Sequence, residues 1–174
     1  MHTTVILTVI GSDRPGLTEA LAAAVLAAGG NWLESHLSRL GGQYVGSVLV
    51  ELPGEALGRL RDSVGHIEAA GLKVEISAAG DAKPTGTPLD FSLVGQDRPG
   101  IVREVSAALA RLGVNIEELE TSTEDGAQSG NRLFKAAAHL LVPPGVSRAD
   151  VQAALEAISG EIMVDFTVDA PAPR

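Results

Sequence analysis

Hydrophobic and polar positions change their period several times along the first half of the chain, and each change predicts a new element. Residues 4–10 are a β-branched apolar run of the kind that forms a buried strand. Apolar residues then return every three or four positions, which predicts one buried stripe of a helix: Leu17, Leu21, Ala24, Val25 and Ala28. Gly29 is the expected stop of that helix. The chain therefore opens with a strand followed by a helix.

A hairpin, a second helix and a last strand are predicted next. The apolar runs 31–40 and 43–52 are joined by Gly41-Gly42, which is typical of a β-hairpin. A helix follows Pro53-Gly54 and is expected to bury one face, made of Leu57, Leu60, Val64 and Ile67. A strand with alternating apolar residues follows, at Leu72, Val74 and Ile76. The predicted order is strand, helix, strand, strand, helix, strand.

The second half of the chain repeats the first at an offset of 84 residues. Gly11-Ser12-Asp13-Arg14-Pro15-Gly16-Leu17 returns as Gly95-Gln96-Asp97-Arg98-Pro99-Gly100-Ile101. In both copies the same apolar spacing follows and leads to a Gly-x-Asn sequence, which ends at Asn31 and at Asn115. A period of about half the chain predicts a duplicated domain and not a solenoid of short repeats.

The second copy follows the same order of elements with small differences. A helix ending at Gly113 is expected, then strands over 114–123 and 132–142 separated by a loop at 124–131. The first strand of this copy is expected at 89–94. Its closing strand carries alternating apolar residues: Ile162, Val164, Phe166 and Val168.

Three helices have predicted start signals. Pro15 and Pro99 are expected at the first helical position, where proline is tolerated. Asp13 and Asp97 are close enough in sequence to cap these two helices. The second helix of the second copy is expected to open with the capping pair Ser147-x-x-Asp150.

This order of elements, twice, predicts an α+β protein built from a duplicated ferredoxin-like βαββαβ sandwich. We expect domain 1 at residues 1–79, a small, breaker-rich linker at 80–87, domain 2 at 88–170 and a frayed tail at 171–174. Units of this size are small for independent stability. The two sheets, or two chains, are therefore expected to pair edge to edge or to pack face to face.

Composition narrows the classes of function. The net charge is −9, with −3 in residues 1–86 and −6 in residues 87–174, so a phosphate backbone would be repelled and direct nucleic-acid binding is not expected. Only five aromatic residues are present, too few for stacking platforms. The chain has no cysteine, no apolar run of about 18 residues and no signal-peptide pattern, so we expect a cytoplasmic location without membrane insertion.

At these motifs the chain resembles a known family. A βαββαβ unit with Asp-Arg-Pro-Gly at the first strand–helix turn and Gly-x-Asn at the second strand resembles an ACT domain, the small-molecule regulatory module of many enzymes of amino-acid metabolism. The resemblance covers about 1–78 and 88–169. Two such units with nothing else attached resemble the glycine cleavage system transcriptional repressor group in particular.

The resemblance implies an amino-acid site at the turn and at the Asn, where two domains meet. Carried over position by position, the implied ligand-binding residues are Gly11, Asp13, Arg14, Pro15, Gly16 and Asn31, and Gly95, Asp97, Arg98, Pro99, Gly100 and Asn115. A turn running into a helix presents free backbone N–H groups and the positive end of the helix dipole, which suit a carboxylate. A turn aspartate suits the ammonium group, and the asparagine amide both donates and accepts hydrogen bonds.

A purely structural interpretation of the motif stands beside this one. Asp as a cap, Pro in a first turn and Gly in a turn are ordinary signals of a helix start, and Asn after Gly is ordinary turn chemistry. The two copies also differ after the asparagine, where Trp32-Leu33-Glu34-Ser35 replaces Ile116-Glu117-Glu118-Leu119. The two sites are therefore expected to be non-equivalent.

Other candidate chemistry is weak in this sequence. The histidines are scattered and form no cluster with one another, so no metal site is expected: His2, His36, His66 and His139. His139 is expected to be a strand residue with a satisfied hydrogen bond. No nucleophile elbow or phosphate loop is present. An acidic cluster is expected on a solvated strand edge: Glu117, Glu118, Glu120, Glu124 and Asp125.

These observations predict a non-enzymatic amino-acid-binding regulatory protein that needs no cofactor and forms a homodimer. The resemblance implies glycine as the small amino-acid ligand and a transcription activator as the protein partner, with no direct contact to nucleic acid. The alternative is a regulatory subunit of an amino-acid biosynthetic enzyme. An enzyme is disfavoured because no catalytic constellation is present.

Overall fold

The computed structural model describes residues 1–69, 71–80, 85–126, 132–158 and 163–165. The chain divides into two compact units, residues 1–82 and 83–174, and each contains its own hydrophobic core. The predicted linker at 80–87 and tail at 171–174 lie wholly or partly outside the described residues, and strand β5 already begins at Thr87.

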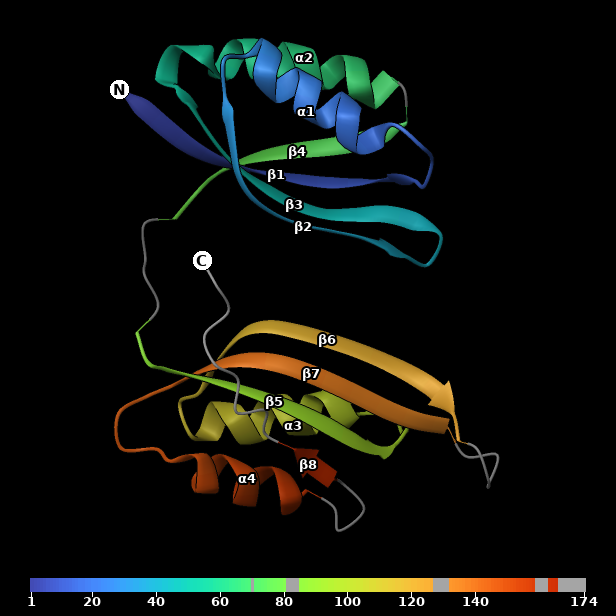
Figure 1. Ribbon diagram of the computed structural model, residues 1–174, viewed down its shortest axis with the longest axis vertical. Coiled ribbons are helices and arrows are strands. Elements are labelled where there is room, and N and C mark those ends of the chain that lie inside the picture. The colour runs from blue at the N-terminus through green and yellow to red at the C-terminus, as the bar shows by residue number, and fades with distance from the viewer. Residues whose placement is uncertain (70, 81–84, 127–131, 159–162, 166–174) are drawn as a thin grey trace. The chain divides into compact units, whose positions relative to one another are not determined.

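The first unit is a four-stranded antiparallel sheet with two helices on one face, as Figure 1 shows. Its elements are β1 (His2–Ser12), α1 (Leu17–Ala27), β2 (Asn31–Leu40), β3 (Gln43–Pro53), the short 3-10 helix η1 (Gly54–Ala56), α2 (Leu57–Ala69) and β4 (Leu72–Ala78). The strand order is β2-β3-β1-β4. The predicted elements and their order are confirmed for this unit.

Buried and more exposed residues alternate along the central strand β1, and this alternation explains how the unit folds. Val5, Leu7 and Val9 are buried beneath the helices, while the residues between them face away. The predicted helical stripes complete the core, with Leu21 and Leu60 fully buried. A single buried aliphatic layer therefore holds the two helices on the sheet.

The start of α1 differs from the prediction. Gly16, and not Asp13, is the N-cap residue, with a left-handed φ of 91° and no side-chain cap, so Pro15 lies in the loop before the helix. Gly100 plays the same role for the equivalent helix, with φ of 89°, and the predicted cap at Asp97 and first helical position at Pro99 are also wrong. A left-handed N-cap turns the chain sharply, and this conformation favours glycine. The predicted helix stop at Gly29 is confirmed, because this residue follows the C-cap with φ of 75°.

The second unit repeats the architecture of the first. Its elements are β5 (Thr87–Gln96), α3 (Ile101–Arg111), β6 (Asn115–Asp125), β7 (Arg132–Val142), α4 (Arg148–Glu156) and β8 (Met163–Asp165), with strand order β6-β7-β5-β8. The predicted capping pair at the start of α4 is confirmed, since Ser147 and Asp150 form a reciprocal capping box. Strand β6 runs two residues beyond its predicted end. Of the predicted last strand, Ile162, Phe166 and Val168 lie outside the described residues.

Strands β2 and β6 are edges of their sheets, and each contains a β-bulge just after its first residues. The register shifts between Trp32 and Glu34 in β2, and between Ile116 and Glu118 in β6. The predicted acidic cluster lies on the β6 edge and is exposed. Among the described residues of each unit, β2 and β6 thus pair with one strand of their own sheet, β3 and β7 respectively.

A matched pair of glycine substitutions tests the left-handed cap. Gly16→Ala places a Cβ on a residue with φ of 91°, and we expect a loss of about 1–2 kcal/mol in unfolding free energy. Gly65→Ala, in the interior of α2 with open space around its Cβ, is expected to stabilise the protein by about 0.5–1 kcal/mol. Urea unfolding measures both. Equal effects of the two substitutions would contradict the cap assignment.

Candidate functional site

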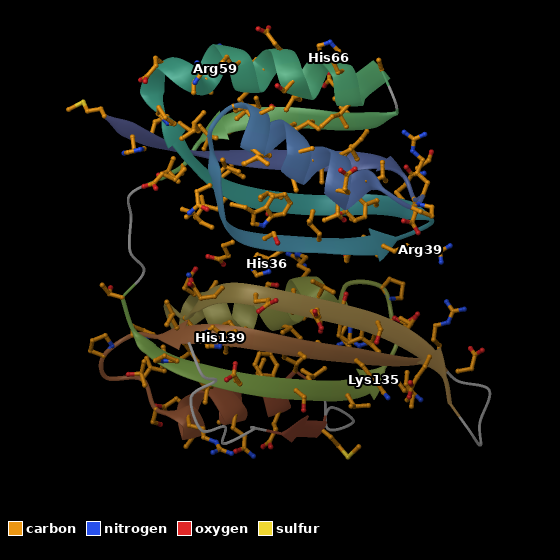
Figure 2. All side chains as sticks on the ribbon, turned by 45° about the horizontal axis from the view of Figure 1, so that its top comes forward. His36, Arg39, Arg59, His66, Lys135 and His139 are labelled. Carbon is orange, nitrogen blue, oxygen red and sulfur yellow. The ribbon has the colours of Figure 1, made fainter. Side chains whose placement is uncertain are left out.

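The strand–helix turn of the first unit lies at one end of its sheet, beside the β2–β3 hairpin. Gly11 is buried at the end of β1, where a Cβ would lie 2.5 Å from the carbonyl oxygen of Gly71, so the close approach of β4 requires glycine. The Asp13 N–H donates to the Gly42 oxygen at 3.5 Å. The Asp13 carboxylate lies 3.3 Å from Nε of Arg39, which Figure 2 labels near the hairpin end of β2. Arg14, in the same turn, is exposed.

Asn31 lies at the opposite end of α1 from this turn. It is the first residue of β2 and pairs with Glu51, which pairs in turn with Thr4 near the start of β1. The eleven residues of α1 span about 16 Å at 1.5 Å per residue, as Figure 1 lets the reader follow. A free amino acid is much shorter than this distance. One unit alone therefore does not bring the two halves of the predicted site together.

An open groove follows the exposed side of α1 and ends at Asn31. It has a volume of about 410 Å³, within the usual range for small-molecule sites, and Thr18, Leu26, Asn31 and Trp32 contribute to its lining. Thr18 Oγ1 lies 2.7 Å from the Tyr44 hydroxyl, which ties the first turn of the helix to β3. Within the described part of the chain, the Asn31 side chain makes no hydrogen bond. Asn31 thus contributes an exposed amide to the lining of the groove.

The turn of the second unit has the same backbone but a different set of contacts. Gly95 is buried in β5, and Asp97, Pro99 and Gly100 are exposed. The Arg98 guanidinium donates two hydrogen bonds to the Glu104 carboxylate, at 2.8 and 2.5 Å. This hydrogen bonding lowers the pKa of Glu104 below its ordinary value and raises the pKa of Arg98. Arg98 is therefore held against the first turn of its own helix.

Asn115 occupies the position equivalent to Asn31. Unlike Asn31, it makes a side-chain hydrogen bond within its own unit. Its amide nitrogen donates to the Glu117 carboxylate, which lies on the bulge of β6. The cavity beneath α3 is apolar and has a volume of about 10 Å³, room for at most one water molecule. Its lining includes Val102 and Ile116, at the positions that Thr18 and Trp32 hold in the first unit.

The open face of the second sheet carries a small polar group outside the predicted site. His139 on β7 lies 2.5 Å from Asp90 on β5 through Nδ1, which confirms the predicted strand histidine with a hydrogen bond; Figure 2 labels it. Glu118 of β6 is the cross-strand neighbour of His139. Across the described residues, no group of three histidine or carboxylate side chains is arranged to hold a metal ion. In that same part of the chain, no helix is long and apolar enough to cross a membrane.

Three residues that contact the predicted site were not predicted: Arg39, Glu104 and Glu117. Arg39 meets Asp13 only because the hairpin folds back to the turn, so no local pattern indicates the pair. Glu104 and Glu117 lie six and two residues after the groups they bind. The absence of a carboxylate at the equivalent positions Ala20 and Leu33 was a usable sequence signal.

Known proteins share both the sequence pattern and the fold. Two family models, both described as the ACT domain, match the chain: one matches residues 3–77 and the other residues 91–137. Phosphoserine phosphatase SerB2 of Mycobacterium tuberculosis is 30% identical over 171 residues, which is 95% of this chain and 40% of that protein. The chain thus spans less than half the length of this enzyme.

Two solved structures resemble the whole chain. An unknown protein from Galdieria sulphuraria has a TM-score of 0.78 and 26% identity, over 95% of this chain and 98% of that one. A proposed glycine cleavage system transcriptional repressor has a TM-score of 0.69, over 96% and 98% of the two chains; at 16% identity it shows the shared fold alone. With its two matched segments and two βαββαβ units, the chain belongs to the ACT domain family, as a tandem pair of such domains.

Proposed function

We propose that the protein is a non-catalytic regulator that binds a small amino acid through its first ACT domain. The observation that carries the proposal is the open groove along α1, which ends at the Asn31 amide and begins beside the turn with the left-handed Gly16. An α-amino acid carries one positive and one negative group. The helix start suits its carboxylate, while Asp13 and the Asn31 amide suit its ammonium group.

The separation of the turn from Asn31 requires a second domain, which we propose to be the first domain of another copy. β2 is an edge strand, with Asn31 at its beginning and Leu40 near the turn. When two β2 strands pair antiparallel, the beginning of one strand meets the end of the other. Asn31 of one copy then lies near the Asp13 turn of the second copy, and the amino acid fits between them.

Charges on the edge strands favour this pairing of β2 strands. β2 carries Glu34 near its beginning and Arg39 near its end, so antiparallel pairing brings opposite charges together. β6 instead carries five acidic residues and no basic one. Two β6 strands would bring like charges together, which opposes their pairing.

We propose that the bound amino acid is glycine and that the regulated partner is a protein. The repressor among the solved structures and the net charge of −9 support a regulator that acts through another protein and without contact to nucleic acid. A transcription activator of glycine metabolism is the partner that this proposal names.

A second candidate function is regulation of an amino-acid biosynthetic enzyme, as a domain or a subunit. The observation that favours it is the 30% identity with phosphoserine phosphatase SerB2, of which the tandem pair covers 40%. The name of that enzyme implies serine as its product, so serine replaces glycine as the ligand in this version. Affinity purification followed by mass spectrometry separates the two partners, because one is a regulator and the other a catalytic chain.

A thermal-shift screen of the twenty amino acids tests ligand binding. We expect one small amino acid, glycine or serine, to raise the Tm, because a ligand at about 100 times its Kd stabilises the native state by about 2.7 kcal/mol. Asn31→Ala is expected to weaken binding about tenfold or more, through loss of a hydrogen bond to a charged group. Lys73→Ala, at an exposed position on the other edge strand β4, is the control. A screen in which no amino acid raises the Tm would contradict the proposal.

A charge swap tests the pairing of β2 strands. By light scattering we expect the wild type to be a dimer, and Arg39→Glu to shift it towards monomer because like charges then meet. The double variant Arg39→Glu with Glu34→Arg restores the opposite charges and is expected to restore the dimer. Lys73→Glu, on the other edge strand β4, is the matched control and should have no effect. A monomeric wild type would overturn this part of the proposal.

A further inference from the structure

Resting on the proposed function, we infer that only the first ACT domain binds the amino acid, and that the second is occupied internally by the carboxylates of Glu104 and Glu117. Each of these side chains takes the hydrogen bonds that a ligand carboxylate or polar group would need. In the second motif, side chains of the protein itself thus take the place that a ligand would have in the first. Three independent differences between the units carry this inference.

The first difference is at the arginine of the turn. In the second unit the guanidinium of Arg98 makes two parallel bonds to Glu104, the strongest geometry for this pair of groups. The position equivalent to Glu104 in the first unit is Ala20, which has no carboxylate at the start of its helix. A ligand carboxylate at the second turn would have to displace Glu104 and would also be repelled by it.

The second difference is at the asparagine. Both strands have a bulge at the same place, and a bulge redirects the side chain of its extra residue. In β6 that residue is Glu117, whose carboxylate accepts from the Asn115 amide. In β2 it is Leu33, which has no polar group, and Asn31 stays without a hydrogen bond among the described residues.

The third difference is the space beside the helix. The groove along α1 holds about 410 Å³ and reaches Asn31. The cavity at the equivalent face of α3 holds about 10 Å³, is lined by apolar side chains such as Val102 and Ile116, and does not reach Asn115. A small amino acid fits the first space and not the second. The three differences lie on α3, on β6 and between these two elements. All three favour amino-acid binding in the first unit over the second.

The internal contact at Arg98 has a ligand-free test. The Arg98 guanidinium lowers the pKa of Glu104, so this carboxylate stabilises the fold above its ordinary pKa, and the contribution disappears as the pH falls through the lowered value. We expect Glu104→Gln to have a lower Tm than the wild type at pH 7, and the difference to close only as the pH falls below the ordinary glutamate pKa of about 4.3 and through the lowered pKa of Glu104. Glu75→Gln, an exposed glutamate on β4, is the control. A constant difference between pH 7 and pH 3 would contradict the contact.

Calorimetry with glycine, and separately with L-serine, tests which unit binds. For the amino acid that binds the wild type, we expect one bound molecule or fewer per chain. Asn31→Ala is expected to lower the affinity about tenfold or more, and Asn115→Ala less than twofold. Two molecules per chain, or equal losses for the two variants, would overturn the inference while leaving amino-acid binding intact. If neither probe nor any of the other amino acids binds the wild type, the proposed function itself fails.

Transplanting the carboxylates completes the test. Ala20→Glu and Leu33→Glu give the first unit the internal carboxylates of the second, and together they are expected to lower the affinity at least tenfold. Ala20→Gln with Leu33→Gln, which has the same size without the charge, is the matched control and should lose less. Circular dichroism checks that both pairs fold. Unchanged affinity in the Glu pair, with the fold intact, would overturn the inference.

Discussion

The central strand of each sheet, buried on its helix side, is the constraint on which the rest of the structure depends. Val5, Leu7 and Val9 hold β1 beneath both helices, and β1 must pair with β3 on one side and β4 on the other. The helix that follows β1 can then only return along the sheet. It places the turn and Asn31 at opposite ends of α1, and it leaves β2 as an edge. An amino acid that contacts both ends therefore needs a second domain, for a reason that lies in the fold itself.

The sequence predicted the elements well because burial on one face leaves a strong periodic pattern. The stripe of α1, the hairpin and the capping box at Ser147 all depend on local spacing, and each was confirmed. The helix start was predicted wrongly, because an Asp-x-Pro-Gly sequence is compatible with a helix capped by the aspartate and with one that begins after the glycine. Only the φ of Gly16 distinguishes the two. The contacts of Glu104 and Glu117 were not predicted at all. They depend on side-chain directions set by a left-handed turn and by a bulge, which periodicity does not describe.

A repeated motif is weak evidence of a repeated ligand site, because its residues can be needed for the fold alone. Gly16 and Gly100 have nearly the same φ, 91° and 89°, so each copy needs its glycine simply to begin its helix. Gly11 is needed where β4 approaches β1. The fold thus requires glycine at positions 16 and 100, and at position 11 in the first unit, independently of any ligand. The two units differ instead at residues outside the motif: positions 20 and 33 in the first unit are Ala and Leu, and positions 104 and 117 in the second are Glu.

After a duplication, two such units can differ at their surface with little effect on the stability of either one. A carboxylate added at the surface of α3 or on the bulge of β6 forms exposed hydrogen bonds and alters no buried contact, so the core of the second unit is retained. Glu117 serves two effects at once, since it bonds Asn115 and adds to the acidic edge that opposes pairing of β6 strands. A ligand site that lies between paired edges is lost when either the polar groups or the pairing is lost. In the second unit a single residue, Glu117, acts on both.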